Sequence, residues 1–458
     1  MQILICGAGR VGRHIARVLA AEGNQVTVID RDAALIERLV SSTDVNGVVG
    51  YASYPDVMER AGARNADLLI AATASDEVNI VACEVGQAMF SIPKRIARIR
   101  AQNYLASVYA DLFSSNHVAI DVVISPEMEV ARAVARRILV PGAFDMIPLA
   151  RDKVRLVGVH CDPACPVVNT PLRQLTSLFP ELSIEVVAIL RQGRTFIPSA
   201  DDQMLTGDDV YFVADTRHVA RALSAFGHNE SPHRRIMLLG GGNIGLAVIQ
   251  QLQRDAPDMK IKLIESDKAR AELVAEVATH ATVLHGDALD PDLLEEANIA
   301  SCEAVVALTN DDQTNILGSL LAKRGGAQRS VTLVNTRSFA GLAPSLGIDA
   351  VVSPNAITVS TILQHVRRGR IRTVHALRDG VGEIVEAEAL DTSALVKKPL
   401  GEARLPDGIV IGAIVRGDEV IIPRADTRIR PRDSVVLFAT RQAVKAVERL
   451  FAVRLEYF

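Results

Sequence analysis

The chain has 458 residues, 49% of them hydrophobic, and a formal net charge of −4 at pH 7. This length exceeds what one hydrophobic core usually serves, so several domains are expected. No apolar run is long enough to cross a bilayer, the chain starts on a strand rather than a signal peptide, and the acidic balance argues against nucleic acid as a partner. We therefore expect a soluble, cytoplasmic protein that reaches a membrane only through another protein.

The first part of the chain alternates short apolar strands with helices. We expect strands at Gln2–Cys6, Gln25–Asp30, Val45–Val49, Leu68–Ala72, Arg95–Arg100 and within 116–125. We expect helices at Val11–Glu22, from Leu35, and at Pro55–Ala61, Glu77–Ala88 and Glu127–Ile138. This alternation predicts an α/β fold, with a Rossmann-type parallel sheet covered by helices on both faces.

The next part has a different texture, with strands separated by Gly, Pro, Asp and Asn turns. It predicts a small α+β domain with strands at Val154–Cys161, Ile184–Arg191, Thr195–Pro198 and Asp209–Ala214, closed by a helix at Arg217–Phe226. The polar segment Gly227–His233 then predicts a linker.

Both parts occur twice. Ile3–Gly12 recurs as Ile236–Gly245, Thr73–Asn79 as Thr309–Asn315, and Ile197–Asp201 as Ile422–Asp426. Matches in this order indicate a duplication. We therefore expect four domains: two Rossmann domains at 1–125 and 233–355, and two α+β domains at 140–227 and 370–455.

A glycine motif, Gly7-x-Gly9-x-x-Gly12, follows the first strand and opens the first helix, and Asp30 ends the next strand. In dinucleotide-binding folds such glycines permit a tight turn, close approach of a pyrophosphate and helix–strand packing. The helix N-terminus then offers free N–H groups to phosphate, and the acid accepts hydrogen bonds from the ribose hydroxyls. The acid favours an unphosphorylated ribose, and therefore NAD or an adenine nucleotide over NADP.

The second copy keeps Gly240, Gly242 and Gly245, with Glu265 in the place of Asp30. Arg10, beside Gly9, could pair with phosphate oxygens, whereas Asn243 brings no charge to the same place in the second copy. This difference predicts two sites with different preferences, or a weaker affinity of the second for polyphosphates.

Polar residues follow the fourth strand, where ligands lie in open sheets. Thr73 and Ala74 stand there, with Thr309 and Asn310 as counterparts, while Asp76, Glu77 and Asn79 are expected to cap the next helix. For Arg98 and Arg100, a phosphate contact and a salt bridge at the sheet edge remain equal alternatives.

Signals for catalysis and for metals are weak. The ten histidines form no recognisable catalytic constellation, and neither a nucleophile elbow nor a lysine-bearing phosphate loop is present. His160, Cys161 and Cys165 suggest a metal by proximity, but a fourth ligand at suitable spacing is missing, which favours ordinary strand and loop residues.

The order of these motifs resembles the TrkA family of bacterial Trk potassium-uptake regulators, in the form with two RCK (KTN) modules, over essentially the whole chain. The residues that carry the resemblance are Gly7–Gly12, Asp30, Thr73–Asn79, Ile96–Arg98 and the Ile-Pro-x-Ala segment. In one departure, the Gly-Asp pair that follows the third strand is Gly286-Asp287 in the second copy but Gly50-Tyr51 in the first.

The resemblance implies a non-enzymatic regulatory subunit on the inner face of the membrane. It implies binding of NAD(H), with ATP or ADP as further ligands, a potassium-translocating partner of the TrkH or TrkG type, and assembly as a homo-oligomeric gating ring. An NAD-dependent oxidoreductase and a regulator of another potassium channel or efflux system remain the alternatives. The first site implied comprises Gly7, Ala8, Gly9, Arg10, Val11, Gly12, Asp30, Thr73, Ala74 and Arg98. The second comprises Gly240, Gly241, Gly242, Asn243, Ile244, Gly245, Glu265, Thr309 and Asn310.

Overall fold

The computed structural model describes residues 1–105, 107–113, 117–178, 183–229, 233–366, 371–377, 382–393, 395–396, 398–403, 405–440 and 442–451. The chain divides into two compact units: residues 1–130 with 353–366, and residues 131–352 with 367–458. No helix in these described ranges is long and apolar enough to span a lipid bilayer.

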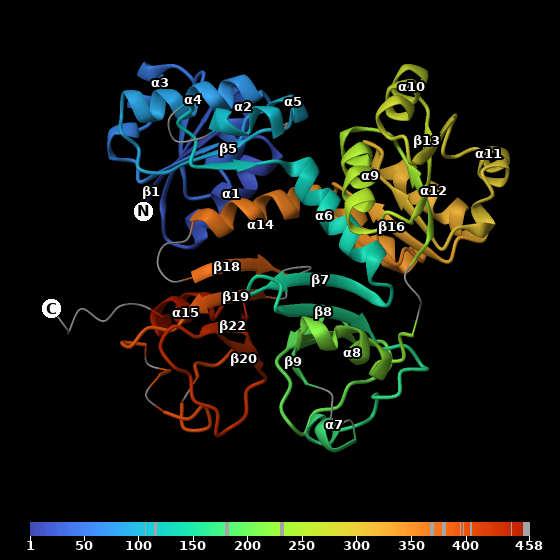
Figure 1. The fold of residues 1–458 in the computed structure, drawn as a ribbon. Helices are drawn as coiled ribbons and strands as arrows, with labels where there is room; N and C mark the ends of the chain where they lie inside the picture. Colours follow the sequence, from blue (N-terminus) through green and yellow to red (C-terminus); the bar gives the residue numbers. More distant parts are fainter. Residues whose placement is uncertain are drawn as a thin grey trace. The chain divides into compact units, whose positions relative to one another are not determined.

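The first Rossmann domain is built on a six-stranded sheet with the order β3-β2-β1-β4-β5-β6, all of whose neighbouring strands run parallel (Figure 1). This order confirms the predicted doubly wound fold. The strands are β1 Gln2–Cys6, β2 Gln25–Asp30, β3 Asn46–Val49, β4 Leu68–Ala71, β5 Arg95–Arg98 and β6 Val122–Ile124. The helices are α1 Arg10–Ala21, α2 Ala33–Val40, α3 Pro55–Arg60, η1 Ala63–Asn65, α4 Asp76–Ala88, α5 Gln102–Leu105 and η2 Ser107–Phe113.

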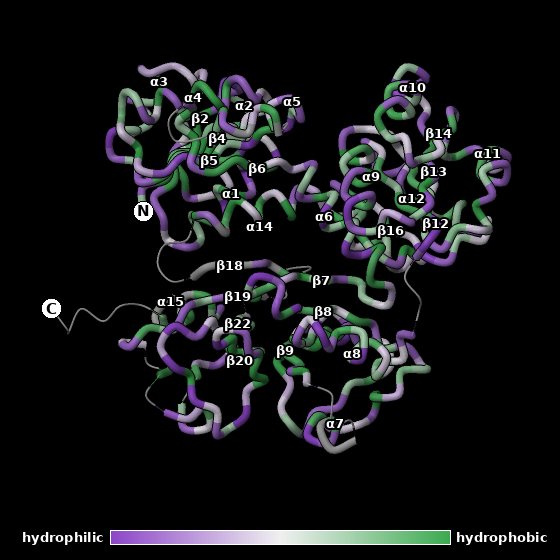
Figure 2. The backbone as a smooth tube through the Cα atoms, viewed as in Figure 1, coloured by the Kyte–Doolittle hydropathy of each residue, from purple (hydrophilic) through white to green (hydrophobic). Residues whose placement is uncertain are grey.

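Side-chain alternation along the strands gives this sheet a hydrophobic core on each face. Ile3 and Ile5 pack into one core, and Leu4 and Cys6 into the other. Figure 2 shows the result, with hydrophobic colouring concentrated on the central strands of the domain.

Helix α14, Pro354–Val366, packs into the core of the first Rossmann domain although it follows the last strand of the second copy. Its residues Val359, Ile362, Leu363 and Val366 are buried against α1 and the sheet. The helix at the same point of the first copy is α6, Pro126–Leu139, most of which belongs to the unit that contains the second Rossmann domain. The two copies are therefore not independent modules, because a helix that follows the second Rossmann sheet completes the hydrophobic core of the first.

The second Rossmann domain repeats the parallel order as β14-β13-β12-β15-β16-β17. Its strands are β12 Arg235–Leu239, β13 Lys260–Glu265, β14 Ala281–His285, β15 Ala304–Ala307, β16 Arg329–Leu333 and β17 Ala350–Val352. Its helices are α9 Asn243–Asp255, α10 Lys268–Val277, α11 Pro291–Glu296, η4 Ile299–Ser301, α12 Asp312–Arg324, α13 Arg337–Leu342 and η5 Ala343–Leu346.

The two α+β domains each contain a five-stranded antiparallel sheet, in the orders β10-β9-β11-β8-β7 and β18-β19-β22-β20-β21. The first has β7 Ala143–Leu149, β8 Val154–His160, α7 Leu172–Leu178, β9 Ile184–Arg191, β10 Arg194–Phe196, β11 Asp209–Asp215, η3 Thr216–His218 and α8 Val219–Ala225. The second has β18 Ile371–Ala376, β19 Glu383–Glu388, β20 Ile409–Arg416, β21 Glu419–Ile421, β22 Ser434–Ala439 and α15 Val444–Phe451. The sequence did not predict α7 or β7, an edge strand whose apolar pattern is interrupted by Asp145 and Pro148.

These two sheets share one hydrophobic core. Buried residues of β8, β9 and β11 in the first domain pack with residues of β19, β20 and β22 in the second, and Tyr211 and Phe438 are the largest of them. The opposite face of each sheet packs on its own helices. The paired α+β domains thus form a single helix–sheet–sheet–helix body.

Glu185 on β9 pairs with Val213 of the shared core, and its counterpart in the second copy is Val410 on β20, an apolar residue that packs against that core. Burial raises the pKa of the Glu185 carboxyl to about 7. When the pKa of a carboxyl is higher in the folded than in the unfolded state, the free energy of unfolding falls as the pH rises above the unfolded-state pKa, and the full loss is reached above the folded-state pKa of about 7. We expect Glu185→Gln to stabilise the protein by about 3 kcal/mol at pH 8 and by less than about 0.5 kcal/mol at pH 4.5. Urea unfolding at the two pH values measures this, and equal effects at both would contradict it.

Candidate functional site

The glycine motif forms a tight strand-to-helix turn at the end of β1. Gly7 has a φ of 109°, which residues with a side chain rarely adopt. A Cβ atom on Gly12 would lie 1.9 Å from the carbonyl oxygen of Gly7, so only glycine lets α1 pack this closely on the turn. Gly9 caps the helix without a side-chain hydrogen bond, and the first N–H groups of α1 therefore remain open to a phosphate.

The second copy repeats this geometry at the end of β12. Gly240 has a φ of 106°, and a Cβ atom on Gly245 would lie 2.2 Å from the Gly240 carbonyl oxygen. Gly242 caps α9, again without a side-chain hydrogen bond. Two helix N-termini of the same design are thus present in the chain.

The acidic residue at the end of the second strand faces the glycine turn in both copies. Asp30 accepts a hydrogen bond from the Ala8 N–H on Oδ2 at 2.6 Å, and one from the Asp32 N–H on Oδ1 at 2.9 Å. Glu265 accepts equivalent bonds from Gly241 at 2.6 Å and Asp267 at 2.9 Å. These bonds fix each carboxylate at the crevice, and each oxygen keeps a lone pair that could accept a ribose hydroxyl.

The polar residues after β4 form a network that the sequence interpretation placed wrongly. Ser75, not Asp76, Glu77 or Asn79, caps α4 by accepting from the Val78 N–H. Asn79 is fully buried, accepts from the N–H and hydroxyl of Thr73, and donates to the Arg98 carbonyl at 2.8 Å. The side chain of Asn79 therefore joins the carboxyl ends of β4 and β5.

Asp76 likewise bonds across the sheet instead of capping its own helix. Its Oδ2 atom accepts from the N–H groups of Arg100 and Ala101, and Asp312 accepts from Asn335 and Thr336 at the same place in the second copy. These bonds hold the chain as it leaves β5 and β16 beside the crevice.

Arginine side chains distinguish the first crevice from the second. Arg98 donates from Nη1 to the Thr73 carbonyl at 3.4 Å, and its Nε is buried without a hydrogen-bond partner in the described chain. Burial lowers the pKa of the Arg98 guanidinium, and the nearby charges of Arg100 and Arg10 lower it further. In the second copy, Leu333 stands in the place of Arg98, Asn335 in the place of Arg100 and Asn243 in the place of Arg10.

Arg100 is the arginine that forms the predicted salt bridge, because its Nε lies 3.2 Å from Oε1 of the buried Glu127. Arg98, by contrast, remains the candidate for a phosphate contact. In the second copy the nearest equivalent charge is Arg270, which donates to the Gly241 carbonyl at 2.7 Å and to the Asn243 side chain at 3.3 Å.

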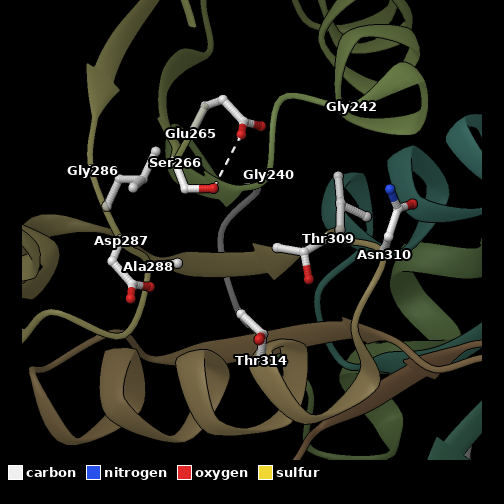
Figure 3. A pocket seen from close by; sticks show the side chains of 12 residues that line it. Gly240, Gly242, Glu265, Ser266, Gly286, Asp287, Ala288, Thr309, Asn310 and Thr314 are labelled. Atoms are coloured by element: carbon white, nitrogen blue, oxygen red, sulfur yellow. Dashed lines mark hydrogen bonds between the residues drawn. The ribbon is translucent and has the colours of Figure 1, made fainter. Parts of the chain in front are cut away.

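A pocket of about 200 Å³ lies at the carboxyl ends of the strands in the second Rossmann domain (Figure 3). Predicted residues that line it are Gly240, Gly242, Glu265, Thr309 and Asn310. Residues that the site prediction missed are Ile264, Ser266, Gly286, Asp287, Ala288, Leu308 and Thr314. Ser266 follows Glu265, and Gly286-Asp287 follows β14, so a rule that includes the residues after each strand of this edge would have found them.

Other predicted residues lie at the glycine turns without lining this pocket. Ala8 and Val11 are buried, and Val11 packs in the domain core, so their backbone rather than their side chains could meet a ligand. Gly241 is buried as well, Ile244 is half-buried, and Ala74 is exposed at the crevice edge.

The adenine side differs between the copies as the sequence indicated. Asp287 lines the pocket in the second copy, and its counterpart Tyr51 is an exposed aromatic residue whose ring stacks on Tyr54 with centroids 5.1 Å apart. The two crevices therefore present different surfaces both to phosphate and to a base.

The cysteines of the first α+β domain belong to its hydrophobic core. Cys161 and Cys165 are buried free thiols, and His160 pairs through Nδ1 with Asp209 at 2.8 Å. A hydrogen bond from Cys161 lowers the pKa of the Cys165 thiol to about 7. Within the described part of the chain, no group of three or more His, Cys, Asp and Glu side chains is placed to hold a metal.

Comparison with known proteins agrees with this duplicated arrangement. The TrkA-N domain matches residues 3–126 and 236–354, and the TrkA-C domain matches residues 156–227 and 384–452. The chain is 51% identical over 458 residues, all of both chains, to the Trk system potassium uptake protein TrkA of Azorhizobium caulinodans. The chain belongs to the TrkA family.

A second member of the family, the Trk system potassium uptake protein TrkA of Vibrio alginolyticus, is 40% identical over 98% of each chain. These relatives are named as components of a potassium uptake system and not for a catalysed reaction. The chain is accordingly a subunit of a potassium transport system rather than an enzyme.

Solved structures with the same fold include a channel and its RCK domain. The GsuK channel covers 99% of this chain and 79% of its own, with a TM-score of 0.62 and 18% identity. The same channel bound to NAD has a TM-score of 0.60, 19% identity and the same coverage. At this identity the similarity establishes the tandem RCK fold.

Proposed function

We propose that this chain is a nucleotide-sensing regulatory subunit of a Trk-type potassium uptake system. The observation that carries the proposal is the paired crevice: each copy combines an open helix N-terminus with a carboxylate fixed at the end of the second strand. The helix N-terminus suits a pyrophosphate, and the carboxylate suits the hydroxyls of an unphosphorylated ribose. The NAD-bound GsuK channel, which has the same fold, supports this choice of ligand.

The first nucleotide site that we propose is formed by Gly7–Gly12, Asp30, Thr73, Ala74 and Arg98. The second is formed by Gly240–Gly245, Glu265, Thr309 and Asn310, extended by Ser266, Gly286, Asp287, Ala288 and Thr314 of the pocket. NAD(H) is the proposed ligand, with ATP or ADP as further ligands. ATP is favoured at the first site because Arg10 and Arg98 can pair with its third phosphate.

Acid–base chemistry finds little support at the second site. The titratable side chains that line the pocket are Glu265 and Asp287, and Glu265 is already engaged by backbone N–H groups. A hydride-transferring enzyme needs a proton donor or acceptor beside the nicotinamide. Binding without turnover is therefore the function that the crevice supports best.

A nucleotide can regulate transport only through different affinities for two arrangements of the modules. The second Rossmann domain and the paired α+β domains belong to one compact unit, to which ligand-dependent movement at the crevice could be transmitted. We propose that the chain assembles as a homo-oligomeric ring and acts on a potassium-translocating membrane subunit of the TrkH or TrkG type, at the inner face of the membrane.

The first test is calorimetric titration of the purified chain with NAD, NADH, ATP and ADP, repeated on Asp30→Ala and Glu265→Ala. We expect each variant to lose about tenfold or more in affinity at one site only, since charge-assisted hydrogen bonds contribute roughly 1.5–3 kcal/mol each. NADH absorbance is followed alongside. Steady oxidation of NADH with a metabolite, or no nucleotide binding by the parent chain, would contradict the proposal.

A further inference from the structure

An arginine-rich loop distinguishes the second α+β domain from the first. The loop at 424–433 connects β21 to β22 and carries four exposed arginines, Arg424, Arg428, Arg430 and Arg432, together with two aspartates. The corresponding loop at 199–208 has no basic residue and three aspartates. The equivalent positions hold Ser199, Gln203, Leu205 and Gly207.

The backbone of the two loops is held in the same way, so the fold does not require the arginines. Asp433 accepts from the Arg430 N–H at 2.7 Å, and Asp208 accepts from the Leu205 N–H at 2.8 Å. Each aspartate also forms a bidentate ion pair across the domain, Asp433 with Arg416 and Asp208 with Arg191.

The match extends to the residue at the centre of each loop. Arg416 donates to the Arg428 carbonyl at 2.9 Å, and Arg191 donates to the Gln203 carbonyl at 2.7 Å. Arg428 also forms a β-bridge with Pro399, and Gln203 forms one with Pro171. The four arginines are therefore added to a scaffold that is complete without them.

One of the four stands in an unfavourable conformation. Arg432 has a φ of 69°, in the left-handed region, where the first copy has Gly207 with a φ of 91°. A residue with a Cβ atom is destabilised there by about 1–2 kcal/mol relative to glycine. A side chain retained at such a position is more consistent with use of its charge than with a neutral surface role.

The loop borders a pocket of about 440 Å³, lined by Val396, Arg416, Ile421 and residues 426–431. Three arginines line this pocket, and one of them, Arg416, is paired with Asp433. The other two, Arg428 and Arg430, have no carboxylate within 4 Å among the described residues. Asp426 also lines the pocket, which consequently offers one acceptor among its donors.

We propose that this pocket binds a soluble small molecule that carries phosphate groups. The guanidinium groups of Arg428 and Arg430 can each pair with two phosphate oxygens, and Arg424 and Arg432 raise the local positive potential. Asp426 suits a hydroxyl or amino group of the same molecule. The carboxylate of Asp426 among the arginines favours a small molecule over an anionic lipid surface. The site is separate from the Rossmann crevices and does not depend on their function.

The experiment is a calorimetric titration of the full chain with inorganic tripolyphosphate, on the parent protein and on Arg428→Gln/Arg430→Gln. We expect the variant to lose one class of site, with affinity there falling at least about tenfold. The Rossmann crevices are unchanged in the variant, so their own binding of tripolyphosphate is the same in both titrations. Arg254→Gln/Arg324→Gln, which removes two exposed arginines from the second Rossmann domain, is the charge-matched control and should bind as the parent does.

Two further measurements keep the outcome decisive. Arg428→Lys/Arg430→Lys keeps the charge and should recover part of the affinity, which loss of folding would not allow. Vesicles containing phosphatidylglycerol are tested by co-sedimentation with the parent and the glutamine variant. Identical tripolyphosphate binding by parent and glutamine variant would overturn the proposal. So would arginine-dependent binding to vesicles without arginine-dependent binding of tripolyphosphate, which would assign the loop to a lipid surface.

Discussion

Asn315→Leu is expected to lower the free energy of unfolding of the second Rossmann domain by roughly 3–5 kcal/mol. Asn315 is fully buried, and its side chain forms hydrogen bonds with the N–H, hydroxyl and carbonyl of Thr309 and with the Leu333 carbonyl. Leucine has a similar size, so the loss comes from buried polar groups left without partners rather than from a cavity. Thr309 lines the pocket, and nucleotide binding there should weaken as well.

The measurement is urea unfolding followed by far-UV circular dichroism, since the chain has no tryptophan to serve as a fluorescence probe. Asn310→Ala is the matched control: Asn310 is an exposed residue of the same pocket, and its replacement should change stability by no more than about 0.5 kcal/mol. A loss below about 1 kcal/mol for Asn315→Leu would show that the network does not hold the crevice together.

Asn79 and Asn315 also show where prediction from the sequence stops. The glycines at the strand-to-helix turns were predictable, because a positive φ or a close backbone contact at these positions admits glycine and few other residues. Asn79 was assigned to a helix cap because it lies in the first turn of α4. Its actual partner, the Arg98 carbonyl, is 19 residues away on β5, and only the sheet topology brings the two together.

Contacts between the copies were beyond prediction for a related reason. Periodicity identified a helix after the first Rossmann sheet, but it cannot tell which of two similar domains an apolar helix face will cover. Helix α14 packs in the core of the first domain. The shared core of the α+β domains is another case, because strands buried on both faces have the same apolar pattern whatever covers them.

The difference between the two crevices, by contrast, was visible in the sequence at Arg10 and Asn243 but only in part. Arg98 and Leu333 are equivalent because the Arg98 carbonyl accepts a hydrogen bond from Asn79, and the Leu333 carbonyl accepts the same bond from its counterpart Asn315. Once this equivalence is known, the first crevice has a second cation that the other lacks. The contrast supports different ligand preferences for the two proposed sites.

Arg98→Leu, which installs the residue of the second copy, is expected to weaken binding of ADP or NAD at the first crevice by about 10- to 100-fold, because it removes a charge-assisted contact worth roughly 1.5–3 kcal/mol. Stability should hardly fall, since within the described residues the Arg98 side chain forms one long hydrogen bond and its Nε has no partner. Arg100→Leu is the contrasting variant, because it leaves the buried Glu127 without its ion pair and should destabilise the domain. Titration calorimetry and thermal unfolding of both variants separate the two effects. Unchanged affinity in Arg98→Leu would leave this arginine with a role in the sheet alone and would shift the charge difference between the crevices to Arg10.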